Sequence, residues 1–178
     1  MNRHYSRRNF VRNMIGLGSL SCVPGAWGST LKGNGLSLLN LHTGESLKTG
    51  IGRDVKPHSQ ELHAVDRVLR DHRSGDIHPI DPDLLLLLVE LQNQVGVTGS
   101  FHVISGYRSP ASNNKLRAAG RGVATRSLHM QGKAIDVRLP GCDLKNLHGA
   151  ARALKCGGVG YYRKSNFIHV DTGRVRYW

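Results

Sequence analysis

Long apolar runs, acidic residues and internal repeats are scarce in this chain of 178 residues. Its longest apolar run after the N-terminal region, from Leu84 to Val89, is bracketed by Asp83 and Glu90. A helix that spans a bilayer needs about 20 mostly apolar residues, so this run is too short. We therefore predict no membrane span beyond the N-terminal region. The rest of the chain, about 150 residues, is long enough for one domain with its own core.

Acidic residues are absent before Glu45. The same region begins with a twin-arginine pattern, Ser-Arg-Arg-Asn-Phe-Val at 6–11, followed by an apolar, Gly/Ser-rich stretch at 14–23 and then by small residues. Charge, apolar stretch and small residues in this order are typical of an export signal. We predict that residues 1–28 are a twin-arginine export signal and that the protein works in the periplasm of a bacterium. The alternative, a cytoplasmic chain with a basic tail, does not explain the order.

Basic residues outnumber acidic ones by 25 to 12, a formal net charge of +13 at pH 7. Four of the arginines lie in the predicted export signal, which leaves +9 for the rest of the chain. Nucleic acid is the usual partner of so basic a chain, but an exported protein meets little of it, and we predict no such partner. Anionic polymers of the cell envelope and phospholipid head groups are the anionic partners that an exported protein would meet. A basic surface without a dedicated ligand is the alternative.

Cysteine occurs only three times, at Cys22, Cys142 and Cys156. Cys22 lies in the predicted export signal. The other two are 14 residues apart, on either side of a predicted helix. An oxidising compartment would permit them to form a disulfide, and the sequence leaves this open. They do not form the closely spaced doublet that is typical of zinc cysteines.

Helical patterns come early in the chain and strand patterns come later. Ser59 can cap a helix, and Asp81-Pro82 is a strong helix start with Gly96 as its stop. We expect helices over 59–70, 81–94, 111–119 and 143–154, strands over 101–105, 157–162 and 167–171, and a candidate hairpin over 36–45. Because helices and strands do not alternate, we predict an α+β fold, with a small antiparallel sheet packed against N-terminal helices. Residues 29–57 are predicted as a linker or hairpin, and 58–178 as the domain.

Two histidines and one aspartate in the second half of the chain form a candidate ligand set. His129 and Asp136 are seven residues apart, and His169 lies 33 residues after the aspartate. Two imidazoles and one carboxylate leave a fourth position for water, as in catalytic zinc sites. Gly132 tolerates the backbone angles of a tight reversal, so we expect two extended segments that fold back there. One such residue alone could be an ordinary polar group on a sheet, but the set of three predicts a metal site.

Four motifs, taken in order, resemble the M15 zinc peptidases, and most closely their YcbK-like branch of exported murein endopeptidases of the LAS type. The motifs are Ser105-Gly-Tyr-Arg108-Ser with Asn113, Ser127-x-His129-x-x-Gly132-x-Ala134-x-Asp136, Gly158-Val-Gly-Tyr, and Phe167-Ile-His169-Val-Asp171-Thr-Gly. The resemblance covers roughly residues 55–178. It implies a Hedgehog/D,D-peptidase-like fold in which the sheet carries a zinc site.

The resemblance also implies roles for individual residues. One Zn²⁺ per chain would be held by His129, Asp136 and His169. Arg108 would point at the scissile carbonyl or a neighbouring carboxylate, because a permanently charged, forked guanidinium can stabilise an oxyanion or bind a carboxylate. A structural salt bridge is the alternative for Arg108. Tyr107, beside it, and Ser127 are candidate substrate-binding residues, although Ser127 could instead hold the turn before His129.

The position of the general base departs from the wider family. Several M15 branches carry an acidic residue or a histidine two or three residues before the last ligand, where this chain has Phe167 and Asn166. Neither side chain can accept a proton. Asp171 is the candidate catalytic base, since on a strand it shares the face of His169. It could equally orient that ligand from behind. Asp143 and His148 are weaker candidates.

The resemblance implies a zinc-dependent murein endopeptidase in which zinc-activated water attacks the amide of a peptide cross-link in peptidoglycan. Both D-Ala–diaminopimelate and diaminopimelate–diaminopimelate bridges remain open as substrates. One alternative is a D,D-carboxypeptidase that trims stem peptides. Another, from a different class, is a non-catalytic module that keeps zinc and binds murein, which the missing base would allow. Peptidoglycan is the predicted partner in each case.

Overall fold

The computed structural model describes residues 35–51, 59–120 and 122–178, so the predicted export signal and, within the segment 29–57, residues 29–34 and 52–57 lie outside the described residues. The elements run along the chain as β1 (Leu36–Asn40), β2 (Ser46–Thr49), α1 (Gln60–Val68), α2 (Pro82–Val95), β3 (Phe101–Ser105), α3 (Pro110–Ala118), the 3-10 turn η1 (Leu128–Gln131), β4 (Ala134–Arg138), α4 (Leu144–Leu154), β5 (Gly158–Tyr162), the 3-10 turn η2 (Arg163–Ser165), β6 (Phe167–Asp171) and β7 (Arg176–Tyr177). Within this part of the chain, the strands form one seven-stranded sheet in the order β2-β1-β3-β4-β6-β5-β7.

The predicted helix boundaries are confirmed, because local capping decides them. The Ser59 hydroxyl accepts a hydrogen bond from the backbone N–H of Leu62 at the start of α1. Asp81 caps α2 through the N–H of Asp83, with Pro82 in the first turn, and Gly96 ends the helix in the left-handed conformation. The α+β fold class is confirmed as well.

The sheet is larger than expected and mixed in direction. Its centre is antiparallel, from β3 through β4 and β6 to β5. At either end a parallel pair is added, β1 with β3 and β5 with β7. The crossover between β1 and β3 contains β2, α1 and α2, which is long enough for a parallel connection. Sequence periodicity identifies strands but not their partners, so this pairing was not foreseen.

The segment that the sequence left as a linker or hairpin contains a β-hairpin within the described residues. β1 and β2 pair antiparallel, and Gly44 takes a positive φ of 73° in the turn between them. The Asn40 side chain accepts a hydrogen bond from the N–H of His42 and donates one to the carbonyl of Val68. Because β1 also pairs with β3, the hairpin belongs to the sheet that carries the candidate site.

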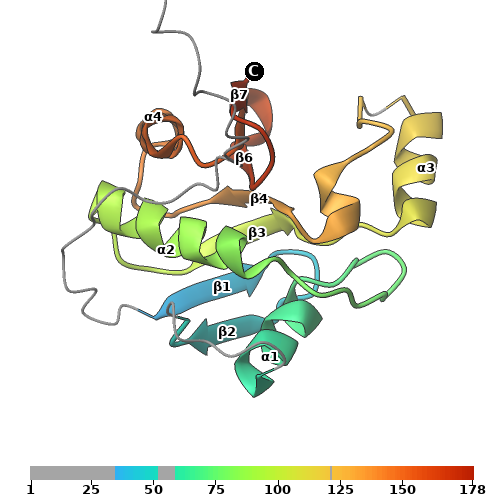
Figure 1. Ribbon diagram of the computed structural model, residues 1–178, viewed down its shortest axis with the longest axis horizontal. Helices are drawn as coiled ribbons and strands as arrows, with labels where there is room; N and C mark the ends of the chain where they lie inside the picture. Colours follow the sequence, from blue (N-terminus) through green and yellow to red (C-terminus); the bar gives the residue numbers. More distant parts are fainter. Residues whose placement is uncertain (1–34, 52–58, 121) are drawn as a thin grey trace, which may run out of the picture. The chain divides into compact units, whose positions relative to one another are not determined.

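The hydrophobic core lies between the sheet and the helices α2 and α4 (Figure 1). Leucines of α2, among them Leu84, Leu88 and Leu91, are completely buried. Ile135 and Val137 of β4 are also fully buried, and they alternate along the strand with Ala134 and Asp136. The other face of the central strands is thereby left for polar side chains. In Figure 1, η1 and α3 lie beside the end of the sheet where β3 ends and β4 begins.

In the described ranges, no helix is long and apolar enough to cross a membrane. Cys142 and Cys156, both in the described part, are not joined by a disulfide. Their thiols instead donate to the main-chain carbonyls of Asp143 and Leu154, respectively.

Candidate metal centre

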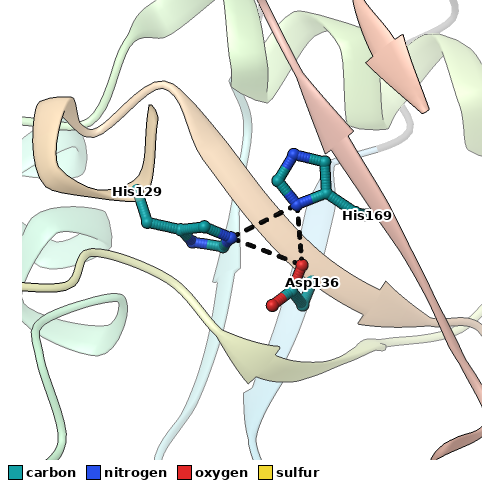
Figure 2. A group of neighbouring side chains, drawn as sticks. All are labelled: His129, Asp136 and His169. Carbon is teal, nitrogen blue, oxygen red and sulfur yellow. Dashed lines mark hydrogen bonds and ion pairs between the residues drawn. The ribbon is translucent and has the colours of Figure 1, made fainter. Parts of the chain in front are cut away.

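His129, Asp136 and His169 converge at one point on the polar face of the sheet (Figure 2). His129 Nε2 lies 3.3 Å from His169 Nδ1 and 3.4 Å from Asp136 Oδ1. The third distance, between His169 Nδ1 and Asp136 Oδ1, is 2.9 Å. All three residues are buried. Three groups far apart in sequence therefore present one donor atom each to a shared centre.

The turn η1 places His129. The expected extended segment is absent here, because residues 128–131 form a 3-10 helix that Gly132 ends in the left-handed conformation at φ 66°. The left-handed backbone of Gly132 confirms the tight reversal expected at this residue. A Cβ there would also overlap the carbonyl oxygen of Pro79. The Nδ1–H of His129 donates to the main-chain carbonyl of Gly106 at 2.8 Å. This bond leaves Nε2 with its lone pair toward the centre.

Neighbouring strands place the other two candidate ligands. Asp136 of β4 and His169 of β6 are directly paired across the antiparallel ladder, so their side chains leave the sheet side by side. Ser105 of β3 pairs with Asp136 on the other side, after a bulge in β3. Cross-strand pairing thus accounts for the closeness of an aspartate and a histidine that lie far apart along the chain.

Asp171 lies behind His169 and is completely buried. Its Oδ2 accepts the Nε2–H of His169 at 3.0 Å and a bond from Arg176 Nη2 at 2.7 Å. Its Oδ1 accepts the backbone N–H groups of Gly158 and Gly173, each at 2.9 Å. Burial by itself would raise the pKa of Asp171, but His169 and the two N–H groups lower it to about 2. A carboxylate so enclosed is placed to orient His169, the second of the two roles left open for it.

The donor atoms fit a divalent metal ion. Each imidazole has its outer nitrogen bonded to an acceptor, a carbonyl for His129 and a carboxylate for His169. With both rings neutral, two nitrogen lone pairs and a carboxylate oxygen face one another, an arrangement that a divalent cation between them would satisfy. Burial alone would raise the pKa of Asp136, but the two histidines hold that pKa below its usual value. Two imidazoles and one carboxylate form a donor set that zinc prefers.

Arg108 lies beside this group and is 7% exposed. Its Nη2 donates to the Ser105 hydroxyl at 3.3 Å and lies 3.9 Å from Asp136 Oδ2, while its Nε has no hydrogen-bond partner among the described residues. Burial lowers the pKa of the guanidinium. The backbone N–H of Arg108 donates to the carbonyl of His129. A buried cation with an unused donor next to the ligands can bind a substrate oxygen.

The remaining predicted residues lie in different surroundings. Tyr107 is mostly buried, and its ring stacks on His78 with 4.6 Å between ring centroids. Ser127 begins η1 without a capping bond from its hydroxyl. Asp143 caps α4, and His148 of that helix lies against Tyr161. Neither Asp143 nor His148 belongs to the group formed by His129, Asp136 and His169, which we call the metal group.

Sequence reasoning missed Arg176, which binds both oxygens of Asp171. It also missed Gly106, whose carbonyl orients His129. The only signal for Arg176 was that the ending Gly173-Arg-Val-Arg176-Tyr-Trp178 resembles the YcbK-like branch. A main-chain acceptor such as the Gly106 carbonyl has no signature in a sequence.

Comparison with known proteins gives a consistent set of relatives. The model of the Peptidase_M15_2 family, described as peptidoglycan L,D-endopeptidase MepK, matches residues 29–178. Peptidoglycan L,D-endopeptidase MepK of Escherichia coli K12 is 45% identical over 143 residues, which cover 80% of this chain and 79% of the relative. Probable peptidoglycan L,D-endopeptidase MepK of Haemophilus influenzae is 41% identical over 153 residues, 84% of this chain and 81% of the relative.

Among solved structures, the Serratia marcescens L-Ala D-Glu endopeptidase ChiX is 26% identical, with a TM-score of 0.35. The match covers 43% of this chain and 62% of that structure.

Proposed function

Because the chain belongs to the Peptidase_M15_2 family of peptidoglycan endopeptidases, we propose that it is a zinc-dependent murein hydrolase that cleaves peptide cross-links of peptidoglycan. The observation that carries the proposal is the convergence of His129, Asp136 and His169, with the outer nitrogen of each imidazole bonded to a separate acceptor. Such outer partners hold a ligand's tautomer and direction before the metal arrives.

The proposed ligands are His129 Nε2, Asp136 and His169 Nδ1. Bound Zn²⁺ supplies Lewis acidity, which lowers the pKa of a water molecule and polarises a carbonyl. The chain's own groups do the rest. Arg108 steadies negative charge on the substrate oxygen, and Ser105 holds the guanidinium in place. Asp171 keeps the proton on His169 Nε2, so that Nδ1 keeps its lone pair for the metal.

The relatives are named L,D-endopeptidases. An L,D bond joins the carbonyl of an L-centre to the amine of a D-centre, which is the arrangement of the diaminopimelate–diaminopimelate bridge. The D-Ala–diaminopimelate bridge is a D,D bond. We therefore propose the first bridge as the substrate, of the two that the sequence left open.

Residues 1–28 are proposed as the twin-arginine export signal, and the periplasm as the place of action. The support is the ordered charge and apolar pattern of that segment, together with a peptidoglycan substrate. Peptidoglycan is the proposed partner, and no nucleic-acid partner is proposed.

Muropeptide analysis after digestion tests the reaction and the bond together. Purified zinc-loaded protein is incubated separately with dimers of each bridge type and with monomeric pentapeptide, and the products are separated by chromatography. We expect loss of the diaminopimelate–diaminopimelate dimer, abolished by a chelator and restored by zinc. The His129→Ala variant serves as the inactive control.

Other outcomes identify the alternatives. Release of terminal D-Ala from the pentapeptide would indicate a D,D-carboxypeptidase. Sedimentation with sacculi without any cleavage would indicate a non-catalytic binder, a candidate that Phe167 and Asn166 favour because neither can serve as a base. Either result would overturn the endopeptidase proposal.

A further inference from the structure

Tyr162 lies on the same face of the sheet as the metal group. On β5, Gly160 pairs with the ligand His169, and Tyr162, two residues on, pairs with Phe167. Side chains two apart on a strand share a face, so Tyr162 is directed to the side of His169 and Asp136. Tyr162 therefore lies on the face of the sheet from which His169 and Asp136 project.

Trp178 covers the gap that Gly160 leaves on this face. A Cβ at Gly160 would lie 2.7 Å from the indole, so only glycine admits the ring there. Two main-chain hydrogen bonds with β5 hold the residue: Tyr161 N–H donates to the Trp178 carbonyl at 2.9 Å, and Trp178 N–H to the Val159 carbonyl at 3.2 Å. The indole lies 5.2 Å from the His169 ring, centroid to centroid.

Hydrogen bonding between the two aromatic residues leaves one donor unused. The Trp178 Nε1–H donates to the Tyr162 phenol oxygen at 2.9 Å. Indole nitrogen can only donate, so the phenol is the acceptor in this pair and keeps its own O–H for another group. Within the described residues, no acceptor for that O–H is found. The Tyr162 ring is held by stacking on Phe167, with 4.6 Å between centroids.

Both side chains remain open to solvent: Tyr162 is 39% exposed and Trp178 is 49% exposed. The Arg176 guanidinium also lies over the Trp178 ring, 5.0 Å from the ring centroid. Two stacked aromatic side chains with an unused O–H donor, on the face that also carries Arg108, suit a peptide rich in carbonyl and carboxylate oxygens. The stem peptide of peptidoglycan has this chemistry.

We propose that Tyr162 is a substrate-binding residue whose O–H donates to a carbonyl or carboxylate oxygen of the stem peptide, and that Trp178 is the positioning residue that orients this donor. The inference rests on the proposed function and names a contact within it. Arg108 and Tyr162 would bind substrate oxygens from two sides of the metal group. Trp178 acts through Tyr162 and does not replace it.

A double-mutant cycle tests the proposal. The wild type, Tyr162→Phe, Trp178→Phe and the double variant are compared as full-length, zinc-loaded proteins. Binding of a monomeric muropeptide stem, which an endopeptidase does not cleave, is measured by calorimetry, and KM and kcat are measured on the cross-linked dimer. Tyr161→Phe is the matched control, because Tyr161 lies on the opposite face of β5 against His148.

Loss of one substrate hydrogen bond should weaken stem binding by about tenfold and raise KM by a similar factor, with kcat and zinc content unchanged. Trp178→Phe should cause a several-fold loss in the wild-type background and none in the Tyr162→Phe background, since coupled residues are not additive. Tyr161→Phe should behave as wild type.

Two results would overturn the inference while the hydrolase proposal stands: wild-type KM and binding in Tyr162→Phe, or a full Trp178→Phe effect in the double variant. The reverse case is also distinguishable. If the wild type cleaves no dimer but its stem binding still depends on Tyr162, the hydrolase proposal is wrong and the binding role holds.

Discussion

The two histidines of the metal group are held in opposite ways. His129 comes from the short turn η1, turns Nε2 inward and bonds its Nδ1–H to the main-chain carbonyl of Gly106. His169 comes from the middle of strand β6, turns Nδ1 inward and bonds its Nε2–H to the carboxylate of Asp171. A main-chain acceptor cannot be removed by substitution, whereas a carboxylate can. The two regions should therefore fail under different mutations.

The segment around His129, the η1 region, and the segment around His169, the β6 region, also differ in what holds them in place. The η1 region depends on backbone shape, chiefly on Gly132 packed against Pro79. The β6 region depends on charge, because Asp171 is bound by Arg176 and by two backbone N–H groups as well as by His169. Mutations that change backbone shape should affect His129, and mutations that change charge should affect His169.

Removing either histidine of the metal group should cause the largest loss of zinc and activity. The loss should be the same for both histidines, whichever region holds them. We expect His129→Ala and His169→Ala each to lose bound zinc and all measurable activity, more than the roughly 10–100-fold loss typical of an outer partner. Metal analysis and dimer cleavage are measured on the same preparations. His148→Ala, on α4, is the control. A variant that kept stoichiometric zinc would remove that histidine from the ligand set.

Asp171→Asn should act on the β6 region alone. The amide does not carry the charge that binds both the Nε2–H of His169 and Arg176, so we expect zinc affinity to fall by about 10–100-fold. Turnover at saturating zinc should be largely kept. Competition with a chromogenic chelator gives the affinity, and Asp83→Asn, on the exposed start of α2, is the control. Unchanged zinc affinity with lost turnover would instead identify Asp171 as the catalytic base.

Gly132→Ala should act on the η1 region through backbone shape. Gly96 has nearly the same φ, 64° against 66°, but a Cβ added there would have no other atom within 4 Å. Alanine at Gly96 should therefore cost about 1–2 kcal/mol of stability, from the left-handed backbone alone. Gly132→Ala should cost more and should weaken zinc binding, because the Cβ also meets Pro79. Urea unfolding compares the two, and equal losses would contradict the close packing.

The smallest expected effect is a loss of folding stability in mild acid, caused by the protonation of a histidine outside both regions. His72 stacks on His42 with 3.7 Å between centroids. Burial, helped by Arg73 and His42, lowers the pKa of His72 from 6.5 to about 4, while Asp71 opposes the shift. Between these values the unfolded chain binds the proton and the folded chain does not. The stability contributed by neutral His72 is thus complete above pH 6.5 and is lost as the pH falls toward 4.

Because the His72 ring is partly exposed, solvent screening should limit this loss to about 1 kcal/mol. Urea unfolding of the wild type and of His72→Gln at several pH values measures it, and the variant should show a flatter dependence. Release of zinc through protonation of the ligands should be the same in both proteins. If His72→Gln retained the full pH dependence of stability, the titrating group would lie elsewhere.

Much of the local structure could be predicted because its causes lie within a few residues. Ser59, Asp81 and Gly96 cap their helices as expected. The turn before Gly132 was predicted as extended, since a run of four residues carries too little periodicity to distinguish a strand from a 3-10 turn. The parallel pairings on both sides of the antiparallel centre depend on which strands meet, and no periodicity encodes that.

The candidate site divides in the same way. Residue types and spacing identified His129, Asp136 and His169 as a set, because few other chemistries need two imidazoles and a carboxylate together. The position of Asp171 on the ligand's face also followed from strand periodicity. Whether that carboxylate faced the substrate or the back of His169 depended on Gly158, Gly173 and Arg176, which enclose it.

By itself, the sequence determined the helix ends, most of the strand segments and the candidate metal donors, because caps, alternation and side-chain chemistry act locally. Only the tertiary structure decided which nitrogen of each imidazole faces the centre. It also decided that Asp171 is hydrogen-bonded to the outer nitrogen of His169 and that Trp178 lies over Gly160 beside Tyr162. These features arise where segments far apart in the chain meet, and the hydrogen bonds that fix them do not exist until the sheet has formed.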